Sequence, residues 1–110
     1  MSYLTKEQLV ALFAEAWRTL SPELIIDNLD ESFVYDSQWV FESLDYSRYK
    51  EYLRNKFSSI RKSNTTISVE IVKDPNLGGT MLSLTQNGNT IYYRLKVKKG
   101  KVIKGDLCMI

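Results

Sequence analysis

Asp36 is the side chain that the sequence places best for moving a proton. It follows Phe33, Val34 and Tyr35, an apolar run typical of a short strand, and a loop is expected after it. At the mouth of an apolar cavity, desolvation would raise the pKa of this carboxyl group toward the range that suits a general base. A structural role is the alternative, because an aspartate at a strand end often accepts hydrogen bonds from the loop backbone.

Other common forms of catalysis have no support in the sequence. It contains no histidine, no phosphate-binding glycine loop and no motif of metal-binding residues. Its single cysteine, Cys108, cannot form an internal disulfide, and it lies in an apolar segment where a small buried side chain is typical. We therefore expect no metal ion, no cofactor and a structural role for Cys108.

A set of large apolar side chains can instead line a binding pocket, since aromatic walls with few polar groups are typical of small-molecule sites. The candidates are Trp17, Trp39, Tyr49, Tyr93, Leu95 and Leu107. Packing in the core is the alternative for Trp17 and Tyr49, which lie in helical stripes. Trp39 lies in an expected loop, where a binding role is equally plausible.

Nearly all helical patterns lie before Asn64. A capping box of Thr5 and Gln8 starts the first helix, and its buried stripe consists of Leu9, Phe13, Trp17 and Leu20. Ser21 and Pro22 then indicate a second, short helix that runs through Leu29. A third helix is expected from about Tyr46 to Arg61, with Asp45 or Ser47 as its N-cap and Lys62, Ser63 and Asn64 at its end.

Strand patterns dominate the remainder. A short strand, Glu31 to Asp36, precedes the third helix, and four strands follow it: Thr66 to Lys73, Thr80 to Gln86, Asn89 to Lys98 and Lys101 to Ile110. Asn87 and Gly88 predict a two-residue hairpin turn, because both tolerate positive φ. The turns at Pro75 to Gly79 and at Lys99-Gly100 are also short, so the four strands should form an antiparallel meander.

Alternation along the last two strands assigns their faces. Tyr93, Leu95 and Val97 are expected to face the helices, with Tyr92, Arg94, Lys96 and Lys98 on the opposite face. On the final strand Ile103, Leu107 and Met109 share the inner face with Gly105, whose missing side chain leaves room near a cavity or allows a bend. Asp106 and Cys108 then face outward.

The outer face of this sheet is more apolar than a fully solvated sheet should be. Its members are Tyr92, Arg94, Asp106, Cys108, Val72 and Met81. Pairing two sheets back to back would cover it, which predicts a symmetric homodimer.

Composition is average for one globular domain spanning residues 1–110, with 44% apolar and 25% charged residues. The net charge of +2 is too small to indicate a nucleic-acid partner. The lysines around one turn, Lys96, Lys98, Lys99, Lys101 and Lys104, are expected to form a solvated hairpin tip rather than an anion site. No 18-residue apolar run is present, so we expect no membrane partner and a cytoplasmic location.

The order of elements predicts an α+β fold in which a cone-shaped, curved antiparallel sheet wraps around three N-terminal helices. This order, together with the segment SPELIIDNLDESFVYDSQW at residues 21–39, resembles the nuclear transport factor 2-like superfamily, a cystatin-like fold. That superfamily includes ketosteroid isomerases and SnoaL-like polyketide cyclases. Because the fold hosts enzymes, binding proteins and scaffolds, the resemblance implies architecture more directly than activity.

The resemblance to ketosteroid isomerases also implies roles for individual residues. It places Asp36 where those enzymes carry the carboxylate that shuttles a proton. Their oxyanion-binding tyrosine of the first helix is replaced here by Leu12, and their second oxyanion donor falls at about Tyr93, whose phenol can donate one hydrogen bond. Loss of an oxyanion donor typically lowers the rate by about two to three powers of ten, which argues against the specific isomerase activity.

Three functions are compatible with these residues and with the expected fold. The first is a small, cytoplasmic, dimeric protein that binds an apolar or aromatic small molecule in its cone pocket. The second is a cofactor-independent isomerase, cyclase or dehydratase in which Asp36 moves a proton and Tyr93 polarises a carbonyl group. The third is a protein-binding module of accessory or immunity type that uses the cone mouth or the lysines Lys98, Lys99 and Lys101.

Overall fold

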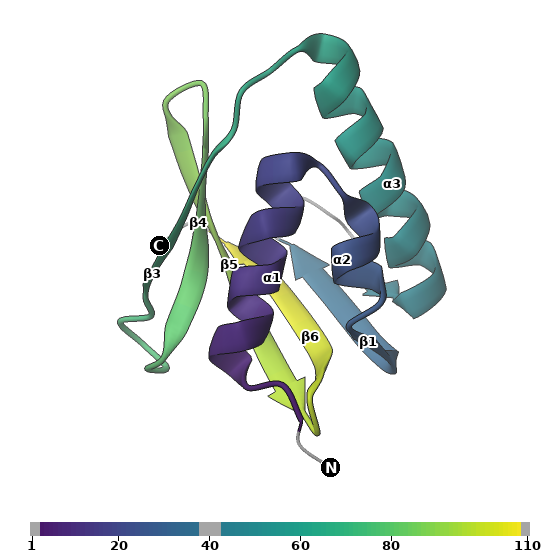
Figure 1. The fold of residues 1–110 in the computed structure, drawn as a ribbon, viewed down its shortest axis with the longest axis vertical. Helices are drawn as coiled ribbons and strands as arrows, with labels where there is room; N and C mark the ends of the chain where they lie inside the picture. Colours follow the sequence, from purple (N-terminus) through teal and green to yellow (C-terminus); the bar gives the residue numbers. More distant parts are fainter. Residues whose placement is uncertain (1–2, 38–42, 109–110) are drawn as a thin grey trace.

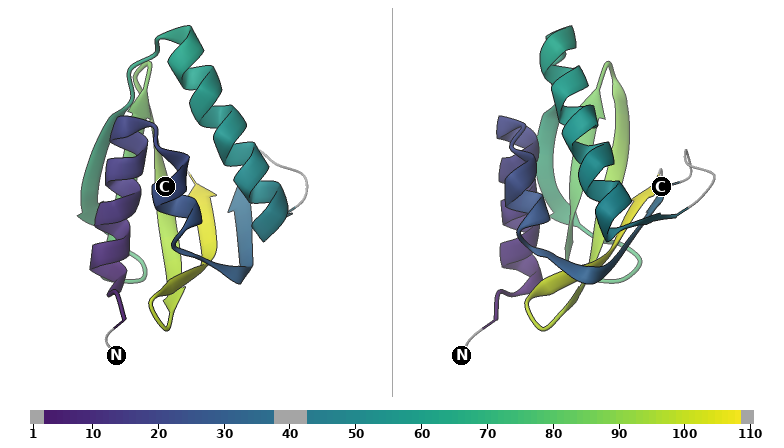
Figure 2. Two further views of the ribbon diagram at one scale, coloured as in Figure 1. Left: turned by 45° about the vertical axis from the view of Figure 1, so that its right-hand side comes forward. Right: turned by 90° about the vertical axis from the view of Figure 1, so that its right-hand side faces the viewer.

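A computed structural model describes residues 3–37 and 43–108 of the chain, and these form three helices and one curved sheet of six strands (Figure 1). The helices are α1 (Lys6–Thr19), α2 (Pro22–Ile26) and α3 (Tyr46–Ser63). The strands are β1 (Leu29–Ser37), β2 (Leu44–Asp45), β3 (Ser68–Lys73), β4 (Thr80–Gln86), β5 (Asn89–Lys98) and β6 (Lys101–Cys108). All three helices cover the same face of the sheet, which curves around them as predicted (Figure 2).

The strand order across the sheet is β2-β1-β6-β5-β4-β3. The predicted meander of β3 to β6 is confirmed, because each neighbouring pair in it is antiparallel. β1, however, lies parallel to β6, with Val34 opposite Lys104 and Asp36 opposite Asp106. The sheet is therefore mixed rather than antiparallel throughout, and strand alternation gave no indication of this because it carries no information on direction.

Helix ends follow local hydrogen bonding. The capping box at the start of α1 is present, since the Thr5 side chain accepts from the Gln8 N–H and the Gln8 side chain accepts from the Thr5 N–H. α3 starts at the predicted cap, where the Asp45 side chain accepts from the Arg48 N–H at 2.9 Å. It ends at Asn64, whose φ of 56° lies in the left-handed region that asparagine tolerates.

Several element boundaries differ from the prediction, and one short strand was not predicted. β1 begins at Leu29 rather than Glu31. α2 stops at Ile26 instead of running through Leu29, because Leu29 is already the first residue of β1 and is buried in the core. The two-residue strand β2, which was not predicted, pairs Leu44 with Tyr35. β3 begins at Ser68 rather than Thr66. The last two residues of the predicted final strand lie outside the described residues.

The predicted faces are confirmed for β5 and for Gly105 and Leu107 of β6, but the assignment of Ile103 to the inner face is wrong. A register shift sets Val102 opposite Val97, so Val102 is buried in the core, and Ile103 borders a hollow together with Lys98. Tyr93 and Leu95 are buried in the core, and Val97 packs against it. Gly105 lies beneath the ring of Tyr93, and an added Cβ there would lie 2.9 Å from Tyr93 Cζ. The glycine therefore leaves room for a phenol, as its position facing the helices predicted. Asn87 and Gly88, with φ of 52° and 79°, form the predicted hairpin turn.

Candidate functional site

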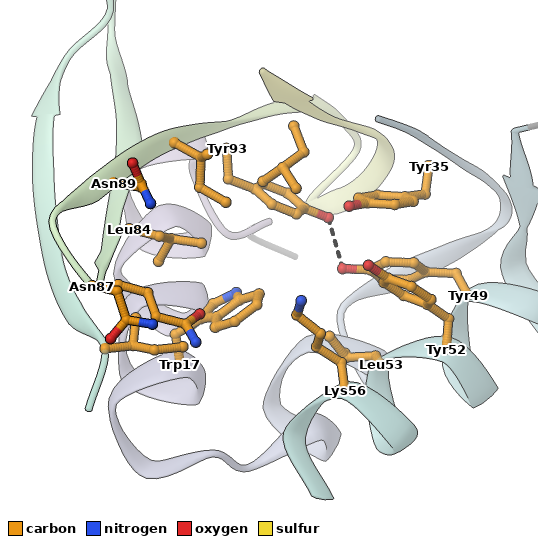
Figure 3. Close-up of a pocket in the computed structure, with 14 residues that line it drawn as sticks. Trp17, Tyr35, Tyr49, Tyr52, Leu53, Lys56, Leu84, Asn87, Asn89 and Tyr93 are labelled. Carbon is orange, nitrogen blue, oxygen red and sulfur yellow. Dashed lines mark hydrogen bonds between the residues drawn. The ribbon is translucent and has the colours of Figure 1, made fainter. Parts of the chain in front are cut away.

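A pocket of about 240 Å³ opens between the helices and the curved sheet (Figure 3). Its closed end is formed by the buried side chains of Tyr35, Tyr49 and Tyr93, which come from β1, α3 and β5. Its open end is formed by the exposed residues Lys56, Asn87 and Asn89. The wall between the two ends is apolar and includes Trp17, Leu53, Leu84, Ile91 and Leu107. We call this site the tyrosine pocket.

The closed end is a packed cluster of phenol rings. The hydroxyl oxygens of Tyr49 and Tyr93 are 2.9 Å apart and share a hydrogen bond (Figure 3). The ring of Tyr35 lies 4.6 Å from that of Tyr49 and 6.0 Å from that of Tyr93, measured between ring centroids. Burial raises the pKa of all three phenols, so each stays protonated at neutral pH and can donate a hydrogen bond.

Two nitrogen donors face the same space. Trp17 is 7% exposed, and its indole Nε1–H is buried and has no hydrogen-bond partner among the described residues. Lys56 extends its ammonium group from α3 toward the pocket, between Trp17 and Tyr49 (Figure 3). Among the 14 lining residues Lys56 is the one that carries a charge, and none is an aspartate or a glutamate.

Most of the predicted pocket residues lie in the pocket wall. Trp17, Tyr49, Tyr93 and Leu107 all line it, although their contact with a ligand stays a prediction. Leu95 does not line it, contrary to the prediction, because it is buried in the core opposite Gly105, farther along β5 from the pocket mouth. Trp39 lies outside the described residues.

The placement of Asp36 in the pocket was predicted wrongly. Tyr35 faces the pocket, so the alternation of side chains along β1 turns Asp36 to the opposite face of the sheet. There the Asp36 side chain is 39% exposed, accepts a hydrogen bond from Ser43, and lies 3.3 Å from Lys104 Nζ. The Ser43 hydrogen bond and the Lys104 charge lower the pKa of Asp36, whereas a general base would need it raised. The alternative structural role, a carboxylate that holds the loop, agrees with these contacts.

Several lining residues were not predicted, although their spacing contains the information. Tyr52 and Lys56 follow Tyr49 by three and seven residues, which places them on the same side of α3. Tyr35 shares its face of β1 with the buried Phe33. Asn87 was recognised as a turn residue and Asn89 as the start of a strand, but no local pattern indicates that this turn lies at a pocket mouth.

The outer face of the sheet has an ion pair with a structural role. The Arg94 guanidinium makes two hydrogen bonds to the Asp74 carboxylate, one of them 3.0 Å long between Nη2 and Oδ1. Asp74 is buried, and it also accepts hydrogen bonds from the backbone of Asn76 and Leu77. The Arg94 hydrogen bond is the main cause that lowers the pKa of Asp74 to about 2. This pair anchors the β3–β4 loop, and neither residue lines the tyrosine pocket.

The lysine-rich turn lies far from the tyrosine pocket. Lys98 and Lys99 stand at one end of β5, and the Asn87-Gly88 turn at the pocket mouth stands at the other. Ten extended residues span roughly 30 Å. Lys101 donates a hydrogen bond of 2.8 Å to the backbone oxygen of Asp27, so this lysine holds β6 to the end of α2.

Neither metal-binding nor membrane-spanning features occur in the part of the chain that the structure describes. In residues 3–37 and 43–108, no three histidine, cysteine, aspartate or glutamate side chains are arranged to hold a metal ion. Within the same ranges, no helix combines the length and the apolar character needed to cross a bilayer.

No protein-family model and no curated protein matches the sequence. Solved structures do match the fold. A nuclear transport factor 2-like protein of unknown function from Cytophaga hutchinsonii is 16% identical with a TM-score of 0.62, over 96% of this chain and 90% of that one. A second such protein, from Pseudomonas putida, is 14% identical with a TM-score of 0.66, over 94% of this chain and 82% of that one.

The same similarity extends to an enzyme. A LEH-like epoxide hydrolase from M. tuberculosis is 14% identical with a TM-score of 0.59, over 92% of this chain and 79% of that one. Identities this low establish architecture but not activity. The chain has the nuclear transport factor 2-like fold, and its function depends on what the tyrosine pocket can bind or convert.

Proposed function

We propose that this protein binds one apolar or aromatic small molecule in the tyrosine pocket. A cavity of roughly 150 Å³ is large enough for a benzene ring, so about 240 Å³ suits a ligand of one or two rings. The wall is largely apolar, and the open end gives access from solvent, as is usual for small-molecule sites. Burial of an apolar ligand would supply affinity at roughly 25 cal/mol for each Å² removed from water.

The buried pair of phenols at the closed end carries the proposal. One hydroxyl of the Tyr49–Tyr93 pair donates to the other, which leaves the second proton free to bond to an oxygen of a ligand. The rings of Tyr35, Tyr49, Tyr52 and Tyr93 line the pocket near this point and offer edges and faces for stacking. The arrangement orients a flat molecule that has a hydrogen-bond acceptor at one end.

Isothermal titration calorimetry with 2-naphthamide tests this proposal. Wild-type protein should bind one molecule per chain, and Ile91→Trp should weaken binding by at least about tenfold, because the larger ring fills the pocket. Tyr92→Trp is the matched control, since Tyr92 is the next residue of β5 and borders a hollow on the outer face. Binding that Ile91→Trp leaves unchanged would place the ligand elsewhere and contradict the proposal.

The geometry does not favour the proton-transfer alternative. Its proposed base, Asp36, lies on the other face of the sheet from Tyr93. The described lining residues include no carboxylate, and the sequence contains no histidine. Protonated phenols can polarise a carbonyl group but are poor bases at neutral pH. Ligand binding therefore explains the apolar wall and the protonated phenols of the pocket better than catalysis does.

A homodimer in the cytoplasm belongs to the same proposal. Val72, Met81 and Tyr92 border a shallow hollow on the outer face, and Val72 pairs directly with Met81. These apolar side chains lie among polar neighbours such as Ser83, Thr85 and Thr90, a mixed surface that a second copy of the sheet would cover in a symmetric dimer.

A further inference from the structure

We infer that the ligand of the tyrosine pocket carries a carboxylate, with Lys56 as its counter-charge and the Trp17 indole N–H as a second donor to its oxygens. This inference rests on the proposed function and narrows the ligand from any apolar or aromatic molecule to an aromatic acid. The carboxylate would lie toward the mouth of the pocket, and the far end of the ring system, with any acceptor for the Tyr49–Tyr93 pair, would lie against the phenol cluster.

The charge of the pocket is the first observation in favour of an acid. Lys56 is the sole charged residue of the lining set, and no acidic residue balances it there. One turn away on its own helix stand Tyr52, Leu53, Ser59 and Ile60, none of which can form an ion pair. No ion pair or hydrogen bond joins Lys56 to another of the described residues. An ammonium group at the mouth of a largely aromatic pocket, with no carboxylate among the lining residues, attracts an anion.

The Trp17 indole nitrogen is the second, independent observation. Buried donors in folded proteins are nearly always hydrogen-bonded, so an orphaned N–H calls for a partner. Its nitrogen is turned toward the space that the lining side chains enclose (Figure 3). A carboxylate that contacts both groups would satisfy the N–H with one oxygen and the ammonium group with the other.

The remaining polar groups of the pocket are also suited to an acceptor-rich ligand. The phenols stay protonated, since burial raises the pKa of Tyr49 and Tyr93. Asn87 and Asn89 present amide N–H groups at the mouth. A cationic ligand would find no negative charge among these lining residues, whereas a carboxylate finds several donors.

The matched pair 2-naphthoate and 2-naphthamide tests the inference, because the two probes share a ring and differ in charge. Calorimetry at pH 7 and low salt should show wild-type protein binding the acid about five- to tenfold more tightly than the amide. Lys56→Gln should abolish most of this preference, and Lys56→Arg should keep it. Lys62→Gln, which removes the same charge from an exposed position near the end of α3, is the matched control and should have no effect.

Two further measurements separate the contribution of the Lys56 charge from that of the Trp17 N–H. Raising the salt concentration to about 1 M, where the screening length falls to about 3 Å, should reduce the preference for the acid in wild-type protein. Trp17→Phe keeps an aromatic ring but removes the N–H. It should therefore lower the affinity for 2-naphthoate several-fold more than Tyr92→Phe on the outer face does.

The possible outcomes distinguish this inference from the proposed function. Equal affinity of wild-type protein for the acid and the amide would overturn the inference and leave the proposed function standing. A preference for the acid that survives Lys56→Gln would overturn the role of Lys56. Failure of both probes to bind at millimolar concentration would overturn the proposed function and the inference together.

Discussion

Gly105→Ala should convert a well-packed contact into a clash at the closed end of the tyrosine pocket. An added Cβ would lie 2.9 Å from Tyr93 Cζ and 3.0 Å from Cε1, and nearer still to the hydroxyl oxygen. Carbon atoms in contact are normally about 3.5 to 4.0 Å apart. The Tyr93 ring must therefore move by roughly 0.5 to 1 Å, and the hydrogen bond to Tyr49 must lengthen or break.

The expected cost can be worked out from these contacts. Overpacking a core costs about 1 to 3 kcal/mol, and loss of a hydrogen bond adds about 1 kcal/mol. The backbone of Gly105 is not in the left-handed region, so alanine can adopt the same backbone conformation. Alanine also lowers the conformational entropy of the unfolded chain, which stabilises the folded protein by about 0.4 to 1 kcal/mol. The free energy of unfolding should fall by about 2 kcal/mol in total.

The same substitution in a variant that lacks the Tyr93 ring separates the cost of the clash from the other effects of alanine. In Tyr93→Leu protein the ring is absent, so Gly105→Ala should be neutral or stabilise by up to about 1 kcal/mol. Urea unfolding followed by circular dichroism on the wild type, the two single variants and the double variant gives both values. A Gly105→Ala cost that is equal in the two backgrounds would refute the reasoning, because it would show that the ring is not the obstacle.

Three other predictions follow from the outer face. Asp74→Asn should lower the free energy of unfolding at pH 7 by about 2 kcal/mol, because the carboxyl pKa is about 2 in the folded protein against an ordinary value of 3.8. In unfolding curves this deficit should shrink as the pH falls from 4 toward 2, because the ion pair stabilises the fold only while the carboxylate is ionised. A deficit that does not change with pH would argue against the Arg94 pairing. Asp36→Asn should leave the calorimetric affinity for 2-naphthamide unchanged, and a large loss would mean that Asp36 reaches the pocket. Sedimentation of the wild type should show a dimer at tens of micromolar, which is an ordinary concentration range for protomer association. Tyr92→Glu should convert this dimer to a monomer, and a monomeric wild type would exclude the dimer.

Much of the fold could be predicted because its causes are local. The capping box at Thr5, the Asp45 cap and the Asn87-Gly88 turn each depend on residues a few positions apart. The inward placement of Tyr93 follows from strand alternation, whereas the need for a glycine at residue 105 comes from the close approach of the Tyr93 ring on the neighbouring strand. The hydrogen-bonding and steric rules behind these features apply to any chain with the same short segments.

The candidate site was predicted only in part, because a pocket is built from separate elements. Trp17, Tyr49 and Tyr93 could be named from their patterns, since large aromatic side chains on apolar stripes face the interior. Lys56 was missed, because an exposed lysine on an amphipathic helix normally faces water, even though its spacing from Tyr49 places it on the same side of α3. Its position beside an aromatic pocket depends on where α3 crosses the sheet.

The sequence by itself determined the order of the elements, their caps and turns, and the inner face of β5, because each of these depends on neighbours along the chain. Only the tertiary structure decided that β1 pairs in parallel with β6, and this pairing sets Asp36 beside Lys104 on the outer face while Tyr35 turns inward. Strand alternation shows that neighbouring side chains oppose each other but not which of them faces the core. Phe33 and Tyr35 face the core because their rings pack against Tyr49 of α3. The opposite choice would bury the Asp36 carboxylate and cost its hydration free energy.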